Sequence, residues 1–410
     1  MNLGIKTLTP IYIGTGEEYN GRSYITEDDN VKFYDLRGII STIDKMPQRD
    51  RFFALLSERR RLVDILKEVF GDDELPWLDD SCIYTLPLSD KIGGDKRIRP
   101  IRTFIGNAKN IYIPGTEIKG AIRTAILYYF LNPELHNKGD DIRSLSERFY
   151  HSLLGKINRR KSLRDIESEI EQEVFRTDRD TDGRYDVLKH LTIRDSELRP
   201  CEECLFVSNI TLMNVHEHDR YRSDGRIAIP SQLCSKDTFF LSKKMRINDN
   251  QLIASELGFS DRQKWVIQYT QLLPNFFQCC YSFSKRLLEA DIRYFNREDS
   301  ILDTSLLMKN LDVDDESRIE PILNQIVDRL KEIQGQNSPE TPLIRLGGSK
   351  GYFSNTISLI LKERNPTMYE KVVSVLSRTP YKFPRTRRVV LSPDGKYDIL
   401  GWIQLSRQAG

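Results

Sequence analysis

The sequence predicts an α+β protein built from two sheet-containing modules with helical insertions. Short stretches that alternate apolar and polar residues, as strands do, occur near both ends of the chain. Longer stretches with helical spacing lie between them, and no regular alternation of strand and helix connects the two kinds. Such an irregular mixture is typical of α+β folds rather than of parallel α/β folds.

The composition is that of an ordinary globular protein. Of 410 residues, 39% are hydrophobic, and 62 basic residues nearly balance 60 acidic ones, for a net charge of +2. This excludes a disordered chain, and the length suggests two or three folded units. No apolar run is long enough for a membrane-spanning helix, and the first residues do not resemble a signal peptide. Six cysteines without a disulfide framework favour a cytoplasmic protein.

The first predicted unit is 1–140. Residues 3–13 have the pattern of a strand that ends in Gly14-Thr15-Gly16, and residues 24–36 that of a hairpin with a polar turn. Helices are expected at about 36–46 and 49–70, and strands at 82–88 and around 101–114. A helix of clear period then begins after Pro114-Gly115. Its apolar face is formed by Ile118, Ala121, Ile122, Ala125, Ile126, Tyr129 and Phe130.

The remaining units are a charged helical insertion at 141–190 and a second module at 191–410. The second module is expected to contain a helical region at 261–335, interrupted at Pro274, with one helix at about 316–334. Its expected strands lie at 191–195, 204–215, 238–247, 343–346, 386–392 and 398–404.

Basic residues are concentrated in two stretches despite the small net charge. Residues 93–123 hold seven basic and two acidic residues, and residues 371–393 hold six basic residues and no acidic one. Segregated charge of this kind could hold a polyanion on one face of the protein. The simpler alternative is solvated surface.

The first candidate motif is the helix start at Gly115-Thr116. Backbone N–H groups at the first turn of a helix suit an anion, and Lys119 and Arg123 lie one turn apart on the same face. The pair could grip successive phosphates of a nucleic acid. An ordinary helix start with two solvated basic residues gives the same pattern.

The second motif is the glycine loop at 347–351. Gly347, Gly348 and Gly351 would allow a ligand to approach the backbone closely, and Lys350 supplies a charge. The following aromatic residue, Tyr352, could stack on a base. The loop does not match the phosphate-binding P-loop spacing, so a plain tight turn is the alternative.

The third motif combines aromatic and basic residues near the C-terminus. Arg385, Arg387 and Arg388 follow Tyr381 and Phe383, a pattern suited to single-stranded RNA. A basic edge strand, which protects against aggregation, has the same pattern.

Candidate catalytic and metal-binding residues are few. His216 and His218 follow an expected strand and could act as acid and base in RNA cleavage, although a polar strand end is the simpler interpretation. Cys201 and Cys204 form half of a zinc pattern without a second half. We therefore expect no catalytic residues, no metal and no cofactor.

Four segments in chain order resemble one family. The opening segment at 8–16, the helix signature at 113–127, the glycine loop and the closing segment at 384–402 resemble the RAMP superfamily, the RNA-binding subunits of CRISPR–Cas effector complexes. A weaker match lies at 191–196, and the stretches at about 140–185 and 260–335 match no segment we can name. The resemblance implies tandem ferredoxin-like, or RRM-like, modules.

Within this superfamily, the length and motifs look most like the fifth subunit of type III-A Csm complexes. This resemblance implies a non-catalytic subunit that caps the guide RNA (crRNA) near its 3′ end and supports crRNA maturation in antiviral defence. The implied partners are the crRNA, the neighbouring Csm backbone and small subunits and a host maturation nuclease, without a membrane. The alternatives are a metal-independent endoribonuclease that processes precursor guide RNA, or the cap subunit of a related type III-B complex.

The predicted RNA contacts combine the glycine-bearing segments with basic residues nearby. They are Gly14, Thr15, Gly16, Gly115, Thr116, Lys119, Arg123, Gly347, Gly348, Lys350, Gly351, Tyr352, Arg385, Arg387 and Arg388.

Overall fold

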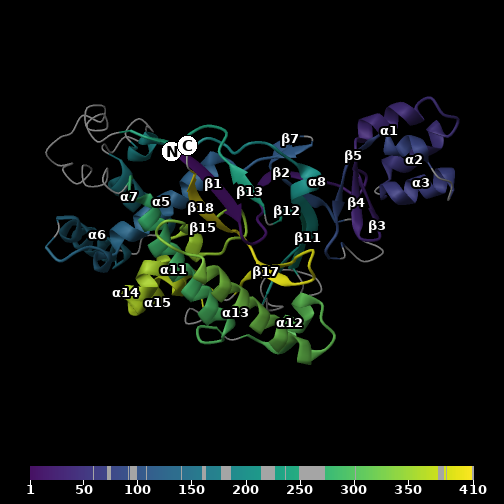
Figure 1. The fold of residues 1–410 in the computed structure, drawn as a ribbon. Helices are drawn as coiled ribbons and strands as arrows, with labels where there is room; N and C mark the ends of the chain where they lie inside the picture. The colour runs from purple at the N-terminus through teal and green to yellow at the C-terminus, as the bar shows by residue number, and fades with distance from the viewer. Residues whose placement is uncertain are drawn as a thin grey trace.

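A computed structural model gives the fold of most of the chain (Figure 1). The described residues are 1–58, 60–71, 75–90, 92, 99–107, 109–139, 141–158, 163–176, 186–213, 227–235, 237–248, 273–300, 302–376, 383–384 and 386–408. His216, His218 and Arg385 lie outside this part of the chain.

A four-stranded antiparallel sheet joins the two ends of the chain. β1 (Asn2–Thr7) lies between β13 (Thr238–Phe240) and β18 (Trp402–Gln408), and β15 (Leu343–Arg345) pairs with the other edge of β18. The register places Ile5 opposite both Phe239 and Leu405, and all three side chains are buried. As a result, the two termini lie side by side (Figure 1).

A six-stranded sheet lies next to the first one. Its order is β17 (Tyr397–Ile399), β16 (Arg388–Leu391), β11 (Leu205–Leu212), β12 (Ile227–Cys234), β6 (Ile101–Phe104) and β2 (Gly14–Tyr19). β12 and β6 are parallel, and the other neighbours are antiparallel. Two smaller sheets consist of β7 (Gly106–Asn107), β8 (Asn110–Ile111) and β10 (Arg199–Pro200), and of β9 (Leu191–Thr192) and β14 (Arg246–Ile247).

The prediction of one strand over 3–13 is wrong. β1 ends at Thr7, and the chain crosses to the six-stranded sheet before β2 begins at Gly14. In the crossing, the Leu8 N–H donates to the Trp402 carbonyl at 2.9 Å and the Ile11 N–H to the Cys234 carbonyl at 3.1 Å. Because these partners belong to two different sheets, the segment changes sheet within a few residues. Gly14, Thr15 and Gly16 therefore begin a second strand rather than end the first one.

The helices cover the sheets as the periodicity predicts. The predicted helix is α5 (Gly115–Leu131), with its apolar face buried except for the half-buried Tyr129, and it packs against α11 (Phe276–Phe295). The charged insertion contains α6 (Asp141–Asn158) and α7 (Leu163–Phe175). α12 (Thr304–Leu311) and α13 (Ile319–Gly335) lie in the lower part of Figure 1. α13 confirms the helix expected at about 316–334. α14 (Ser358–Arg364) and α15 (Pro366–Leu376) complete this layer.

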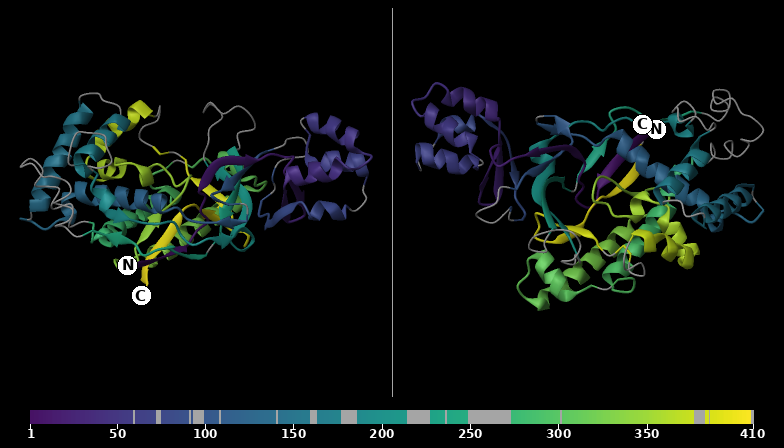
Figure 2. Two further views of the ribbon diagram at one scale, coloured as in Figure 1. Left: turned by 90° about the horizontal axis from the view of Figure 1, so that it is seen from above. Right: turned by 180° about the vertical axis from the view of Figure 1, so that it is seen from behind.

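A small unit stands out from the body of the molecule (Figure 2). It consists of the sheet of β3 (Tyr24–Glu27), β4 (Asn30–Tyr34) and β5 (Cys82–Pro87). Its helices are α1 (Leu36–Ile43), α2 (Arg49–Ser57), α3 (Leu62–Phe70) and α4 (Pro76–Asp79). The predicted hairpin at 24–36 is confirmed, but it belongs to this unit. A separate apolar core that includes Ile39, Phe52 and Ile65 stabilises it.

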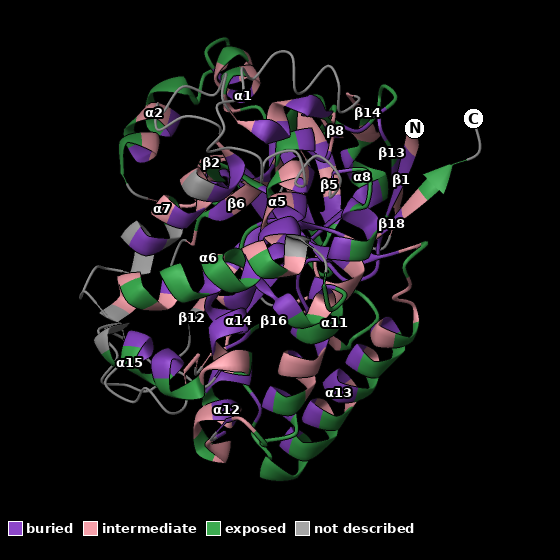
Figure 3. Ribbon diagram, turned by 90° about the vertical axis from the view of Figure 1, so that its left-hand side faces the viewer, coloured by how far each residue is buried: buried purple, intermediate pink, exposed green. Residues whose placement is uncertain are grey.

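The main apolar core lies between the sheets and α5, α11 and α13. α13 carries a row of exposed residues, whereas α5 is buried or half-buried along most of its length (Figure 3). The α+β prediction, with sheet-based modules and helical additions, is thereby confirmed. The division at 140 and 190 stays a prediction. Among the helices that the structure describes, none has the length and apolar character needed to cross a bilayer.

Candidate nucleic-acid interface

Three of the predicted segments meet at the first turn of α5. The Gly347 N–H donates to the Glu117 carboxylate at 3.3 Å, and the Gly348 N–H donates to the Tyr12 carbonyl at 2.7 Å. The glycine loop therefore lies against both the opening segment and the start of the helix. One surface is thus built from positions more than 200 residues apart in the chain.

Two glycines make this close packing possible. Gly347 has φ +80°, and a Cβ there would lie 2.2 Å from the Tyr12 carbonyl oxygen. A Cβ at Gly115 would lie 2.4 Å from the Ile193 carbonyl oxygen. Both distances are too short for any side chain, so the interface requires glycine at these positions.

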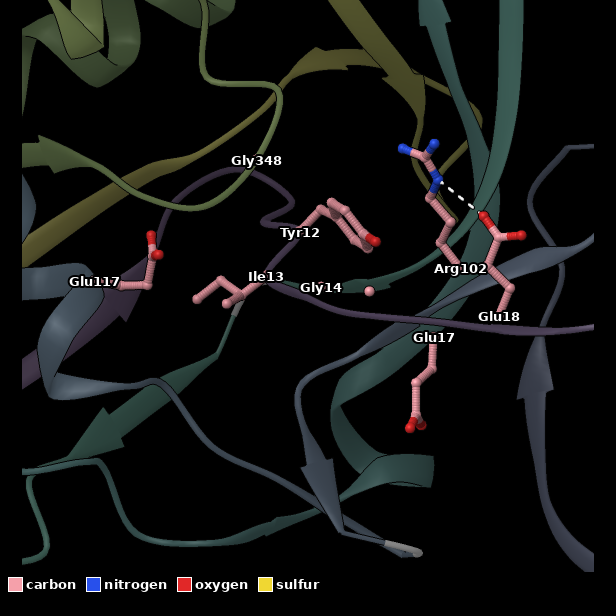
Figure 4. A pocket seen from close by; sticks show the side chains of 9 residues that line it. Tyr12, Ile13, Gly14, Glu17, Glu18, Arg102, Glu117 and Gly348 are labelled. Atoms are coloured by element: carbon pink, nitrogen blue, oxygen red, sulfur yellow. Dashed lines mark hydrogen bonds and ion pairs between the residues drawn. The ribbon is translucent and has the colours of Figure 1, made fainter.

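A pocket of about 370 Å³ opens beside this contact (Figure 4). Its lining consists of Tyr12, Ile13, Gly14, Gly16, Glu17, Glu18, Arg102, Glu117 and Gly348. Arg102 Nε lies 3.4 Å from the Glu18 carboxylate, whereas Glu17 and Glu117 add two further negative charges. With three carboxylates and one guanidinium, the pocket is better suited to a group that donates hydrogen bonds, such as a ribose hydroxyl or a base amino group, than to a phosphate.

Tyr12 forms one wall of the pocket as a neutral phenol. Its ring is 8% exposed and packs on an apolar cluster that includes Phe206 and Leu233. Burial raises the pKa of the Tyr12 hydroxyl; Arg102 lowers this pKa to a smaller extent and Glu18 raises it slightly. The hydroxyl therefore keeps its proton and can donate or accept a hydrogen bond.

The two predicted lysines are half-buried near the same turn. Burial lowers the pKa of Lys350, an effect that the nearby Glu117 carboxylate opposes. Burial also lowers the pKa of Lys119, and Asp186 opposes that effect. Both lysines lose their protons more readily than exposed lysines, and a phosphate beside either one would restore the higher pKa.

Arg123 and the helix N-terminus have partners within the protein. The Arg123 guanidinium lies 2.8 Å from the Asp186 carboxylate, 3.4 Å from that of Glu171, and over the ring of Phe175. These contacts join α5 to the charged insertion and its C-terminal flank. The Gly115 N–H donates to Asp195 Oδ1 at 2.9 Å. The expected phosphate contact at this N–H group is therefore replaced by a carboxylate of the protein itself.

The prediction of Arg387 as an accessible RNA contact is wrong. Its Nε lies 2.8 Å from Asp291 Oδ1, and Arg345 Nη1 lies 2.8 Å from Asp291 Oδ2. All three side chains are no more than 6% exposed. A buried carboxylate shared by two guanidiniums fixes α11 to β15 and to the start of β16, and no RNA phosphate can reach Arg387 in this arrangement.

The other predicted residues lie on or near the surface. Arg388 is exposed and donates to the Ser349 hydroxyl at 3.1 Å, so it borders the glycine loop. Thr116 is exposed at the start of α5, and Thr15 bonds to Thr103 across β2 and β6. Tyr352 is half-buried against Phe383, with ring centroids 4.8 Å apart. The RNA-binding roles of these residues stay predictions.

Sequence reasoning missed the polar residues that line the pocket. Glu117 lies inside the helix signature and Tyr12 inside the opening segment, so their neighbourhood was identified but their roles were not. Arg102 was counted only as part of a basic stretch. The alternation of the strand at 101–104 places Arg102 and Phe104 on the same face, which indicates that Arg102 does not point only to solvent. Glu18, the ion-pair partner of Arg102, lies on another strand and could not be found from sequence spacing.

The cysteine pair does not resemble a metal site. Cys201 and Cys204 lie on α8 (Cys201–Cys204), where burial raises their thiol pKa values to about 11 and about 12. The Cys204 thiol donates to Asp237 at 3.1 Å. Within the described ranges, no three His, Cys, Asp or Glu side chains come together as metal ligands.

Comparison with known proteins gives consistent matches. The sequence pattern of the RAMP superfamily matches residues 4–352. A Methanocaldococcus jannaschii protein named "CRISPR system Cms protein Csm5" is 25% identical over 431 aligned positions, which cover 99% of this chain and 88% of that protein. A Streptococcus thermophilus protein of the same name is 29% identical over 138 residues, covering 30% of this chain and 37% of that protein.

Solved structures show the same fold. A chain in the structure "Cryo-EM structure of Csm-crRNA-target RNA ternary complex in type III-A CRISPR-Cas system" matches with a TM-score of 0.68 and 19% identity, covering 99% of this chain and all of that one. The structure "Crystal structure of T.onnurineus Csm5" matches with a TM-score of 0.62 and 20% identity, covering 98% and 99%. At these identities the likeness concerns the fold.

Proposed function

Because the chain belongs to the RAMP superfamily, we propose that it is a non-catalytic, RNA-binding subunit of a type III-A CRISPR–Cas complex of the Csm type. Two relatives with the name Csm5 support this assignment, one of them over nearly the whole chain. A fold neighbour from a complex that contains crRNA makes guide RNA the expected ligand.

The observation that carries the proposal is the meeting of the opening segment, the start of α5 and the glycine loop. The backbone is exposed at Gly14, Gly16, Gly348 and Gly351, where a strand of RNA can approach closely. Lys119 and Lys350 lie near enough to this turn to hold its phosphates. The adjacent carboxylate-lined pocket can accept hydrogen bonds from a ribose hydroxyl, which would favour RNA over DNA. Such contacts hold the backbone without reading the sequence.

The position within the complex is the finer part of the proposal. The length of the chain and its combination of motifs support a position near the 3′ end of the guide RNA. There it would contact the neighbouring Csm backbone and small subunits and support crRNA maturation by a host nuclease. The cap of a type III-B complex would share the same helix signature.

RNA binding across a salt series tests the proposal. If about four phosphates are neutralised, log K should fall against log salt with a slope near −3, from about −0.7 per phosphate of a single strand. Lys119→Ala/Lys350→Ala should lower the affinity and reduce that slope. A matched control, Lys309→Ala/Lys331→Ala, removes two exposed lysines from α12 and α13 and should leave both unchanged. An affinity independent of salt would refute the proposal.

The competing function is an endoribonuclease that uses His216 or His218, which lie outside the described residues. Denaturing gels of the same binding reactions distinguish the two functions. A non-catalytic subunit leaves end-labelled RNA intact. Defined products that persist in EDTA and disappear in His216→Ala/His218→Ala would establish the nuclease.

A further inference from the structure

The connection between β13 and β14 carries exposed basic residues, which together with one neighbour we call the basic loop. The basic loop consists of Lys243, Lys244, Arg246 and Arg194. All four side chains are exposed, and within the described part of the chain no carboxylate forms an ion pair with any of them. These four exposed positive charges outnumber the two exposed carboxylates beside them, Asp195 and Glu197, so the potential at this surface is positive.

The backbone of the basic loop is held in place by hydrogen bonds. The Ser242 N–H and hydroxyl both donate to the Asp195 carbonyl, at 3.0 and 2.7 Å. Met245 is buried, and its N–H donates to the Met1 carbonyl at 2.9 Å. Arg246 then pairs with Thr192 in the sheet of β14 and β9. The charges therefore project from an ordered backbone, which lowers the entropy cost of binding a ligand.

The basic loop and the glycine loop lie on opposite sides of the first turn of α5. Gly115 contacts Asp195, which adjoins the basic loop, whereas Glu117 contacts Gly347. Successive helical residues are rotated by about 100°, so positions 115 and 117 point in nearly opposite directions. Between them, Thr116 and Gly120 are exposed, and the space around Gly120 is open. These two exposed, uncharged residues therefore form a strip of helix between the two loops.

Exposed apolar side chains adjoin the basic loop. Phe240 is 43% exposed and Leu198 is 54% exposed, and the Glu197 N–H donates to the Phe240 carbonyl at 2.8 Å, which brings the two segments together. An exposed ring beside unpaired basic side chains is the combination that binds single-stranded nucleic acid, through stacking and phosphate contacts. A protein partner would also cover Phe240 and Leu198, because aromatic and apolar side chains are common in protein interfaces. What favours RNA here is the path to the glycine loop across the exposed Thr116 and Gly120.

We infer that the basic loop is a second RNA-binding site, which holds the phosphates of a single strand that passes over Thr116 and Gly120 from the glycine loop. Phe240 stacks on one base of this strand. The inference rests on the proposed RNA-binding function and extends its surface across α5 to residues outside the predicted set.

Two variants of the full-length protein test the inference in the salt series with single-stranded RNA. Lys243→Ala/Lys244→Ala removes two exposed charges and should reduce the salt slope by about 1.4 and the affinity by about tenfold at physiological salt, from about 0.7 per phosphate contact. Gly120→Glu adds a negative charge to the strip between the loops and should also weaken binding. Lys309→Ala/Lys331→Ala, which removes the same charge from the far end of the molecule, should bind like the wild type (Figure 1).

The outcomes distinguish a failure of this inference from a failure of the proposed RNA-binding function. Wild-type protein that binds no RNA would refute the proposed function and the inference together. Binding that Lys119→Ala/Lys350→Ala weakens, but Lys243→Ala/Lys244→Ala and Gly120→Glu leave unchanged, would overturn the inference alone. The same would follow if the basic-loop variant lost only its association with another protein subunit and kept full RNA affinity.

Discussion

The C-terminal basic stretch and the basic loop carry similar side chains but use their charges differently. In the C-terminal stretch, Arg387 shares Asp291 with Arg345, and the three groups are buried together. In the basic loop, Lys243 and Lys244 are exposed and have no carboxylate partner among the described residues. The difference arises because a carboxylate from α11 reaches the first group, whereas no carboxylate of the described residues reaches the second. The number of basic residues in a stretch therefore does not determine how many can bind RNA.

Removal of the Asp291 carboxylate, which Arg345 and Arg387 share, should have the largest effect on stability. Asp291→Ala leaves two buried guanidiniums without their partner and should lower the free energy of unfolding by about 3–5 kcal/mol. Urea unfolding measures this change. Asp328→Ala is the control, because Asp328 is exposed and lies 4.0 Å from Lys331, so its loss should cost less than about 0.5 kcal/mol. Equal stabilities of the two variants would contradict the structural role of the buried group.

The adjacent residues Arg387 and Arg388 should differ in their effects on stability and on RNA affinity. Arg387→Met breaks one half of the buried group and should cost about 2–3 kcal/mol in the free energy of unfolding. Arg388→Met removes an exposed side chain and should change stability by less than about 0.5 kcal/mol, while lowering RNA affinity. Thermal unfolding and RNA binding on the two variants are the measurements. The reverse order of stabilities would show that the burial is assigned to the wrong residue.

Two glycines near α5 should respond in opposite directions to the same substitution. Gly347→Ala forces a Cβ into a left-handed backbone and against the Tyr12 carbonyl, which should cost about 1–3 kcal/mol and weaken RNA binding. Gly120→Ala places a methyl group in open space within a helix and should stabilise the protein by about 0.5–1 kcal/mol. Urea unfolding of both variants measures the two changes in the free energy of unfolding. A neutral Gly347→Ala would contradict the close packing at the interface.

Much of this interface could be predicted from sequence, because its signals are local. The apolar period identified α5, and the glycines marked both segments where the backbone approaches closely. The burial of Arg387 could not be predicted, because its partner Asp291 lies almost a hundred residues away. The crossing before β2 was missed for the same reason, since its partners are Cys234 and Trp402. The basic loop is too short to stand out in counts over longer stretches.

RNA affinity should also fall as pH rises, through Lys350. Burial holds the pKa of Lys350 below the 10.5 of an unburied lysine, and a bound phosphate raises it. Binding therefore takes up a proton once the pH passes the lowered pKa, and affinity declines from there upward. Arg remains charged throughout this range, so Lys350→Arg should flatten the profile. Identical profiles for the wild type and Lys350→Arg would exclude Lys350 as a phosphate contact.

The smallest effect is expected in the unit that stands out from the body. Arg61, which precedes α3, and Asp64 on α3 form a partly exposed pair at 2.8 Å, so Arg61→Ala should change the free energy of unfolding by less than about 1 kcal/mol. RNA affinity should not change, because the pair is remote from α5 (Figure 2). A marked loss of RNA affinity would extend the binding surface to this unit.

Lysine acetylation with and without bound RNA, read by mass spectrometry, tests most directly which charges hold the strand. The central claim is that RNA crosses the first turn of α5 between the glycine loop and the basic loop. It predicts that RNA protects Lys243, Lys244 and Lys350 from acetylation and leaves the exposed Lys309 and Lys331 as reactive as before. Equal protection of all five lysines, or protection of only the last two, would contradict the claim.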